Sequence, residues 1–186
     1  MKKIFVLVLL TSALWSATVT FKGDEVTLNS NGLKVGMKAP VFTVVDKDFQ
    51  EVNVGGKKKK VQVIAFIPSF DSAVCRMETI AFNQKISKMK NVVVTMISKD
   101  LPFAIGRFCH DNNIKNVVTL SDYKDANNVL RYGSTISSPP FLEGFFSRVV
   151  YVVDTNGKVV YSEVVQEITN EPDYDKVIHT VNRLSK

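Results

Sequence analysis

The clearest signal of the fold lies between Val61 and Cys75, where the sequence reads VQVIAFIPSFDSAVC. Residues 61–67 are almost entirely apolar and rich in β-branched side chains, which predicts a strand buried on both faces of a sheet. Pro68 lacks a backbone donor and cannot continue a central strand. Polar and turn-forming residues follow until Cys75, where a helical pattern opens. This succession of strand, turn and helix predicts an α/β fold.

Similar segments recur along the chain. Two more apolar, β-branched runs, over 92–97 and 149–153, predict further buried strands. Apolar residues at helical spacing and end signals predict helices over 74–89, 101–112, 123–132 and 173–184. Asp100 is a candidate cap for the second of these helices. The alternation predicts a mixed central sheet flanked by helices.

Two hairpins frame this alternation. TVTF and EVTL stand on either side of Lys22 and Gly23, which predicts an N-terminal β-hairpin. The run VVYVVDTNGKVVYSEVV predicts a second hairpin near the C-terminus, and we expect Asn156 and Gly157 to supply the two positive-φ positions of a type I′ turn. The order of elements is compatible with a thioredoxin-like fold and also with other α/β sheets.

Cys75 is the first candidate for chemistry. A cysteine in the first turn of a helix faces unpaired backbone N–H groups and the positive end of the helix dipole, and both favour thiolate over thiol. The hydroxyl of Ser72, three residues earlier, can cap the helix and donate to a thiolate or to a substrate oxygen. The alternative is that Cys75 is a small buried apolar residue. Pro68 and Ser72 beside it favour the reactive role.

Composition limits the class of protein. The chain has 186 residues, of which 45% are hydrophobic, too many for a disordered chain, and its length predicts one domain. Two cysteines are too few for a disulfide-stapled miniprotein. Soft or borderline metal ligands are limited to Cys75, Cys109, His110 and His179, so we predict no metal site and no cofactor.

The N-terminus predicts export. Lys2 and Lys3 precede an apolar run that is shorter than the ~20 residues of a membrane-spanning helix. Small residues follow at 16–17, so we expect a signal peptide over 1–17, a mature domain over 18–186 and a periplasmic location. An uncleaved anchor is the alternative, and no stable membrane association is otherwise expected. The lysines at 57–60 are interpreted as a solvated turn, with no nucleic-acid partner.

A family resemblance extends these predictions. PSFDSAVC (68–75) resembles the PxxxTxxC motif of peroxiredoxins, and the chain is similar to their bacterial thiol peroxidase subfamily in several blocks. ISKDLPFAIGRFC resembles its second-cysteine helix, and SRVVYVVDTNGKVVYSEVVQEITNEPDYDKV resembles its C-terminal third. The resemblance covers 18–186. It implies a thioredoxin-like fold, with a central mixed sheet flanked by helices and an N-terminal hairpin.

The resemblance also implies roles. Cys75 matches the peroxidatic cysteine, and Cys109 matches the resolving cysteine with which it forms an intramolecular disulfide, as in the atypical two-cysteine type. Pro68 matches the proline that shields the thiolate, and Arg148 matches an arginine that faces the pocket. The implied substrates are hydrogen peroxide and organic hydroperoxides. A thioredoxin-like reductant and a homodimer are the implied partners, with residues 137–146 as a loop near the pocket and the dimer interface.

Two positions depart from the subfamily pattern. Ser72 stands where most members have threonine, which keeps the hydroxyl and loses the methyl group that restricts its rotamers. Ile80 occupies the position, five residues after Cys75, where a basic residue is often found. Neither change removes a group that the chemistry requires.

Other functions of the two cysteines remain open. In an exported protein, Cys75 and Cys109 could form a permanent disulfide in a non-catalytic binding module. A thiol–disulfide oxidoreductase usually carries C-x-x-C, whereas Ser72 and Glu78 flank Cys75 at that spacing. A disulfide requires Cα atoms within ~7 Å of each other. Since each cysteine is predicted to lie in its own helix, we expect at least one of these helices to unwind during turnover.

Overall fold

The computed structural model describes residues 16–86, 89–126 and 128–185. Most of the predicted signal peptide lies outside them. In chain order the elements are β1 (Thr18–Phe21), β2 (Asp24–Leu28), β3 (Phe42–Asp46), β4 (Glu51–Val54), β5 (Val61–Phe66), α1 (Ala73–Ile86), β6 (Val92–Ser98), α2 (Pro102–Asp111), β7 (Val118–Ser121), the 3-10 helix η1 (Val129–Tyr132), β8 (Ile136–Ser138), β9 (Val149–Val153), β10 (Val159–Val164) and α3 (Tyr174–Leu184).

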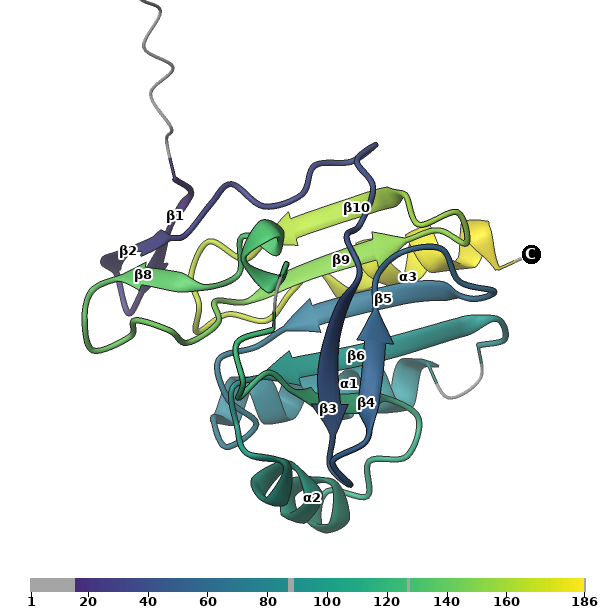
Figure 1. Cartoon of the computed structure of the whole chain (residues 1–186), viewed down its shortest axis with the longest axis horizontal. Coiled ribbons are helices and arrows are strands. Elements are labelled where there is room, and N and C mark those ends of the chain that lie inside the picture. The colour runs from purple at the N-terminus through teal and green to yellow at the C-terminus, as the bar shows by residue number, and fades with distance from the viewer. Residues whose placement is uncertain (1–15, 87–88, 127, 186) are drawn as a thin grey trace, which may run out of the picture.

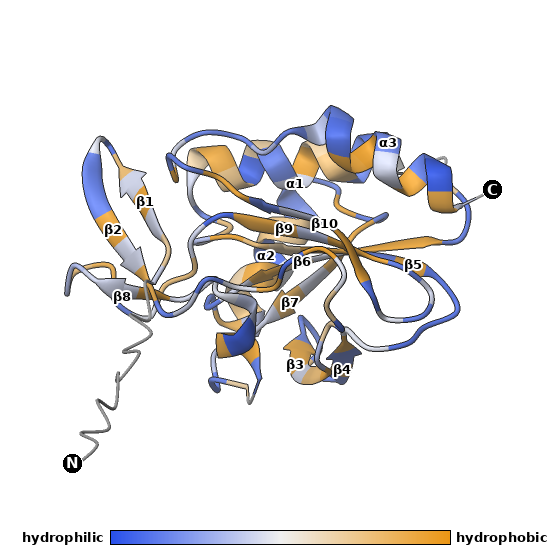
Figure 2. Ribbon diagram, turned by 90° about the horizontal axis from the view of Figure 1, so that it is seen from above, coloured by the Kyte–Doolittle hydropathy of each residue, from blue (hydrophilic) through white to orange (hydrophobic). Residues whose placement is uncertain are grey.

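The main sheet has seven strands in the order β10-β9-β5-β6-β7-β3-β4. The β5–β6 and β6–β7 pairs are parallel and the others antiparallel, so the predicted mixed sheet is confirmed. Helices α1 and α3 lie against one face, and the β3–β4 hairpin crosses the other (Figures 1 and 2). Strand β5 therefore lies in the middle of the molecule, as its apolar sequence predicted.

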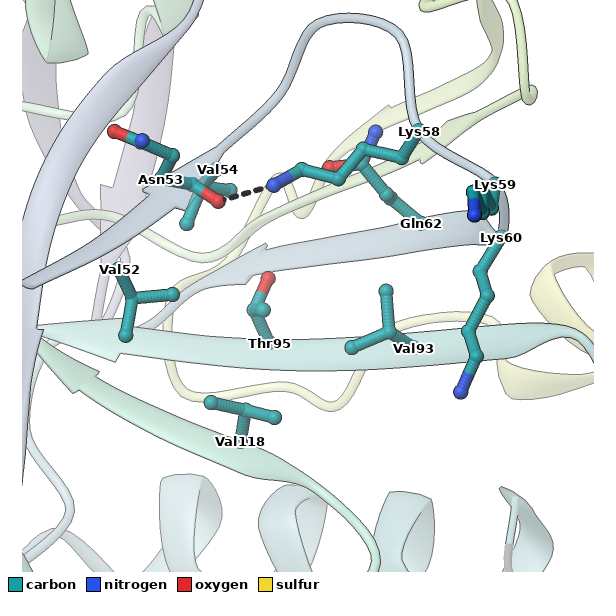
Figure 3. Close-up of a pocket in the computed structure, with 10 residues that line it drawn as sticks. All are labelled: Val52, Asn53, Val54, Lys58, Lys59, Lys60, Gln62, Val93, Thr95 and Val118. Carbon is teal, nitrogen blue, oxygen red and sulfur yellow. Dashed lines mark hydrogen bonds between the residues drawn. The ribbon is translucent and has the colours of Figure 1, made fainter.

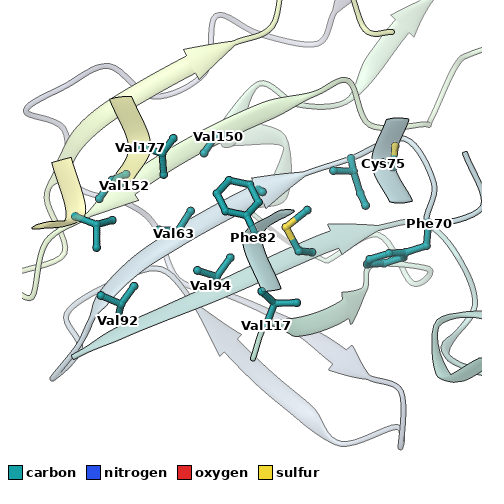
Figure 4. Packing of buried hydrophobic residues seen from close by; sticks show 14 of the residues in the cluster. Val63, Phe70, Cys75, Phe82, Val92, Val94, Val117, Val150, Val152 and Val177 are labelled. Carbon is teal, nitrogen blue, oxygen red and sulfur yellow. The ribbon is translucent and has the colours of Figure 1, made fainter. Parts of the chain in front are cut away.

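Burial along β5 follows the two-residue period of a strand. Val63 and Ala65 belong to the core beneath α1 and α3, whereas Ile64 and Phe66 belong to the core on the opposite face. Figure 4 shows the first of these cores, with Val63 among the side chains of neighbouring strands and Phe82 of α1 over them. Because both faces are covered, the strand has no polar face, and its end is held rigidly where the loop to α1 begins.

The N-terminal hairpin is confirmed as a separate small sheet, in the order β1-β2-β8. Lys22 and Gly23 both have positive φ, 54° and 89°, so this is the hairpin with the type I′ signature. The carbonyl of Ala17 accepts a hydrogen bond from the Leu28 amide (2.8 Å), so pairing in the hairpin extends to the last residue of the expected signal peptide.

The type I′ turn predicted for the second hairpin is wrong. Gly157 has φ 76°, but Asn156 is not among the positive-φ residues. The Gly157 amide donates to the Asp154 carbonyl, and the Asp154 side chain accepts from the amides of Asn156 and Lys158. The aspartate therefore stabilises a longer loop, in which a type I turn is followed by a glycine with positive φ.

The helix predicted over 123–132 is also wrong. The described residues form turns there, and only η1 is helical. Asp125 and Asn128 have φ of 55° and 73°, and the Asp122 carboxylate accepts from the Ala126 amide (2.7 Å). Aspartate and asparagine side chains bond locally to the backbone and so compete with a helix. The other three helices are confirmed, although residues 87–88 at the expected end of the first lie outside the described residues.

Candidate functional site

The loop between β5 and α1 is held by one carboxylate. Asp100 accepts hydrogen bonds from the Ser69 hydroxyl (2.8 Å), the Phe70 amide (2.7 Å) and the Ser98 hydroxyl (2.8 Å). The prediction that Asp100 caps the following helix is therefore wrong. That helix begins at Pro102 behind Leu101, which makes no side-chain cap bond. The carboxylate instead fixes the loop that delivers Cys75.

Ser72 lies directly before the first residue of α1. Its hydroxyl oxygen accepts a hydrogen bond from the Cys75 amide (3.3 Å), and its carbonyl accepts one from the Arg76 amide (3.0 Å). This is the geometry of an N-cap, and the predicted capping role is confirmed. Cys75 is the third residue of α1 and is fully buried, so its sulfur lies near the positive end of the helix dipole in a water-poor setting.

Arg148, immediately before β9, faces Cys75 from the strand that neighbours β5. It is only 1% exposed, and its Nη2 lies 3.5 Å from the Cys75 sulfur. Nε and Nη2 also donate to the Ile168 carbonyl, at 3.1 and 3.0 Å, and Nη1 donates to the Glu78 carboxylate. Burial opposes the charge, but Glu78 and Cys75 more than offset this effect and raise the pKa of Arg148. The guanidinium is therefore a fixed cation beside the sulfur.

Glu78 is a site residue that sequence reasoning missed. It lies one helical turn after Cys75 and is fully buried, with one carboxylate oxygen on Arg148. Its other oxygen, Oε1, has no hydrogen-bond partner among the described residues. Burial raises the pKa of Glu78 to about 7, although the charge of Arg148 works against that rise. The sequence did contain a signal for Glu78: it lies three residues after Cys75, and residues three apart share one face of a helix.

Cys109 lies near the C-terminal end of α2. Its side chain is buried, and its sulfur is 3.1 Å from the Thr119 hydroxyl. Burial raises the pKa of this thiol, with Thr119 and Lys47 partly opposing the rise, so Cys109 is held as a thiol. A cleft of about 570 Å³ opens beside it, lined in part by Lys47, Gly106 and His110.

The two cysteines belong to one apolar core. Both are free thiols, and both lie in the cluster beneath α1 and α3. The rings of Phe70, from the active-site loop, and Phe108, beside Cys109, are in contact with their centroids 5.0 Å apart. Figure 4 shows Cys75 and Phe70 at the same end of this core. Apolar packing thus links the loop that carries one cysteine with the helix that carries the other.

Comparison with known proteins agrees with this geometry. The redoxin family model matches residues 34–178. The thiol peroxidase of Aquifex aeolicus is 47% identical over 167 residues, which cover 90% of this chain and 98% of the relative. The thiol peroxidase of Bacillus subtilis is 44% identical over 170 residues, with 91% and 99% covered.

The chain belongs to the peroxiredoxins, in the thiol peroxidase family. It is thus an oxidoreductase of the peroxiredoxin type. A solved peroxiredoxin-like protein from Aquifex aeolicus superposes with a TM-score of 0.85 at 47% identity, covering 90% of this chain and 96% of that one. A thiol peroxidase from Chromobacterium violaceum, at 19% identity, has a TM-score of 0.79 and covers 89% and 96%, which supports the thioredoxin-like fold alone.

In this peroxiredoxin the structure brings together three of the five predicted site residues. Ser72 and Arg148 both contact Cys75, through its amide and its sulfur. Pro68 is half-buried in the loop that follows β5 and has no described polar contact with the sulfur. Cys109 shares the core of Cys75 but lies in another helix. The predicted site is therefore a compact Ser72–Cys75–Arg148 centre with a second cysteine on α2.

The lysine block lies away from this centre. Lys57, Lys59 and Lys60 are exposed, which confirms a solvated turn. Figure 3 shows this turn over a cavity of about 360 Å³ with a floor of valines, where Lys58 bonds to the Asn53 carbonyl. The cavity reaches Gln62 at the start of β5, whereas Cys75 follows the other end of that strand.

Within residues 16–86, 89–126 and 128–185, no group of three or more His, Cys, Asp or Glu side chains could hold a metal ion. None of the helices in these ranges has both the length and the apolar character needed to cross a bilayer.

Proposed function

We propose that this peroxiredoxin reduces hydrogen peroxide and organic hydroperoxides through Cys75. The observation that carries the proposal is the Arg148 guanidinium, 3.5 Å from the buried Cys75 sulfur at the N-terminal turn of α1. A buried cation and a helix N-terminus both stabilise a thiolate, and the thiolate is the nucleophilic form of cysteine. Pro68 limits the access of solvent from the loop side.

In the first step the Cys75 thiolate attacks one oxygen of the peroxide. The S–O bond forms as the O–O bond breaks, and the second oxygen takes a proton and leaves as water or alcohol. Arg148 and the backbone N–H groups at the start of α1 are placed to bind the departing negative charge. The Ser72 oxygen accepts from the Cys75 amide, which leaves its own proton free to donate to the peroxide. The product is the Cys75 sulfenic acid.

In the second step Cys109 attacks the sulfenic acid. Its sulfur bonds to the Cys75 sulfur, the hydroxyl of the sulfenic acid leaves as water with the thiol proton, and an intramolecular disulfide results. Cys75 lies in α1 and Cys109 in α2, each within helical backbone in the reduced protein. Local unwinding of at least one helix is therefore part of this step.

A thioredoxin-like reductant completes the cycle. It restores both thiols by thiol–disulfide exchange, and the cleft beside Cys109 offers it an approach.

The working unit is a homodimer. The exposed rings of Phe141 and Phe145, in the loop that the family resemblance assigns to the dimer interface, support this assembly.

Export by residues 1–17 places the enzyme in the periplasm, and the basic start before an apolar run supports that location.

The test is a count of free thiols before and after one equivalent of peroxide. We expect two thiols to be lost per wild-type chain. We expect Cys75→Ser to abolish peroxide consumption and Cys109→Ser to complete a single turnover that stops at the sulfenic acid. Full multi-turnover activity of Cys75→Ser would rule out the assignment.

The same assay tests the alternative that the sequence left open, an exported binding module with a structural Cys75–Cys109 disulfide, against which the two free thiols in separate helices already count. That module would be purified already oxidised, would resist reduction by glutathione and would lose no thiols to peroxide. The wild-type protein treated with glutathione before the thiol count is the matched control.

A further inference from the structure

The N-terminal hairpin is joined to the segment that binds the active-site arginine. The Thr20 amide donates to the Gln166 carbonyl (2.6 Å), and the Ile168 amide donates to the Thr20 carbonyl (2.8 Å). Thr20 and Glu167 form an isolated parallel bridge. The side chain of Ile168 is buried in the core of the small sheet, against residues of β1 and β2. The position of the Ile168 backbone is thus set by the hairpin.

One carboxylate secures this junction. Glu167 accepts hydrogen bonds from the Thr20 hydroxyl (2.8 Å), the Lys22 amide (3.1 Å) and the Gly23 amide (3.1 Å). It also accepts from the amide (3.0 Å) and the hydroxyl (2.6 Å) of Thr169. Desolvation opposes the charge of this carboxylate, but the bonds from Thr169, Thr20 and Gly23 prevail and lower the pKa of Glu167 to about 2. A single ionised side chain thus holds the turn of the hairpin and Thr169, at the end of segment 166–169, together.

The carbonyl next to Glu167 orients Arg148. Nε and Nη2 of Arg148 both donate to the Ile168 oxygen, and Nη1 donates to Glu78. A planar guanidinium held on two sides has a fixed plane, and this plane brings Nη2 to the Cys75 sulfur. If the Ile168 carbonyl moved, Arg148 would keep its charge but lose its direction.

We propose that Glu167 is a positioning residue for the reaction at Cys75. It couples the N-terminal hairpin to the Ile168 carbonyl and thereby aims the Arg148 guanidinium at the sulfur. This role rests on the proposed peroxidase function and extends it by giving the hairpin a task in catalysis. Transition-state stabilisation by a preorganised cation depends on its placement, so loosening the carbonyl lowers reactivity without removing any group that contacts the peroxide.

The test uses the full chain with Glu167→Gln and Glu167→Ala. Glutamine keeps an acceptor oxygen but has no charge, so we expect a several-fold lower rate constant for peroxide with Glu167→Gln and roughly a tenfold lower one with Glu167→Ala. The second readout is the pH profile of Cys75 alkylation, resolved from Cys109 by peptide mass spectrometry. We expect its midpoint to move to higher pH in both variants. Glu25→Gln, an exposed acid on β2 of the same hairpin, is the matched control and should keep both values.

The outcomes separate positioning from simple structural support. Circular dichroism identifies the folded fraction, and rates are expressed per folded molecule. Folded variants with a wild-type rate and alkylation midpoint would overturn the proposal, even if they melt at a lower temperature. If Glu167→Ala fails to fold, Glu167→Gln decides by the same criteria. A wild-type protein unreactive toward peroxide would overturn the peroxidase function instead, whereas the alkylation profile would still report on the coupling through Glu167.

Discussion

At the scale of single residues, the active site depends on a charge pair whose members are both removed from water. Glu78 and Arg148 are buried together, and the cysteine sulfur is the third member of the group. Burying an ion pair costs desolvation energy that its mutual attraction does not always repay. Here the raised pKa of Glu78, about 7, indicates that burial outweighs the attraction of Arg148. The pair therefore places Arg148 at a cost to the stability of the fold.

This cost has a pH dependence. The folded pKa of Glu78 lies above its ordinary value of 4.5, so between about pH 4.5 and 7 the folded state binds more protons than the unfolded state. The contribution of Glu78 to stability is thus fully present below pH 4.5 and is lost as the pH rises through about 7. We expect the free energy of unfolding of Glu78→Gln, relative to wild type, to increase between pH 5 and pH 8, measured by urea denaturation.

The exposed Glu25→Gln change is the control and should follow wild type across this range. A wild type that gains stability over Glu78→Gln between pH 5 and pH 8 would show that pairing with Arg148 outweighs burial.

Among the elements, α2 combines the proposed resolving cysteine, Cys109, with modest helical stability. It spans ten residues, begins at a proline without a side-chain cap and contains Gly106 in its interior. Glycine destabilises a helix interior by roughly 0.5–1 kcal/mol relative to alanine. Such a helix unwinds more readily than a well-capped one. This property suits the release of Cys109 that the proposed disulfide formation requires.

Gly106→Ala tests this use of α2. A Cβ added at Gly106 meets only the Lys47 Cβ, at 4.0 Å, so the substitution fits without a clash. We expect it to stabilise the helix by roughly 0.5–1 kcal/mol and, if unwinding limits the step, to slow disulfide formation about two- to fivefold. Formation of the Cys75 sulfenic acid should be unchanged. Rapid quenching with a thiol-alkylating reagent and a sulfenic-acid trap measures the two steps separately.

Ala104→Gly, in the same helix, makes the opposite change and should speed the disulfide step. Equal rates in both variants would mean that α2 stays helical and that α1 supplies the movement.

For the molecule as a whole, the small N-terminal sheet is the start of the described fold and, by the coupling that we propose through Glu167, a support for the reaction at Cys75. The hairpin carries the turn that Glu167 binds, and its core includes Ile168. Ala17 already participates through its carbonyl. A signal peptide that ends at this residue would therefore adjoin a structured element directly, with no linker.

Export is tested on the full chain expressed in a bacterium with two membranes. We expect the mature protein to be recovered from the periplasmic fraction with Thr18 as its first residue, as measured by intact mass and N-terminal sequencing. Val8→Arg interrupts the apolar run and should leave the unprocessed chain in the cytoplasm. An unprocessed wild-type chain in the membrane fraction would favour the anchor, and one in the cytoplasm would contradict export.

Features that depend on near neighbours follow from the amino-acid sequence alone. The buried strand β5, the turn at Pro68, the Ser72 cap and the position of Cys75 at the start of a helix all follow from residues within a few positions of one another. The N-terminal hairpin and helices α1, α2 and α3 follow in the same way. The helix expected over 123–132 does not form because the Asp122 carboxylate bonds to the Ala126 amide and Asp125 and Asn128 adopt positive φ, and the competition between two local patterns depends on the surrounding contacts.

The groups around the Cys75 sulfur depend on contacts between distant segments of the chain. Arg148 reaches Cys75 across 73 residues of sequence, and Thr20 reaches Glu167 across 147. Asp100 had a plausible local role as a helix cap, yet its carboxylate bonds to a loop 30 residues away. Periodicity shows which side chains are buried but not which of them meet. The ion pair, the carbonyl that aims the guanidinium and the carboxylate that holds the hairpin exist because the fold brings distant segments together, and most buried polar groups find their partners there.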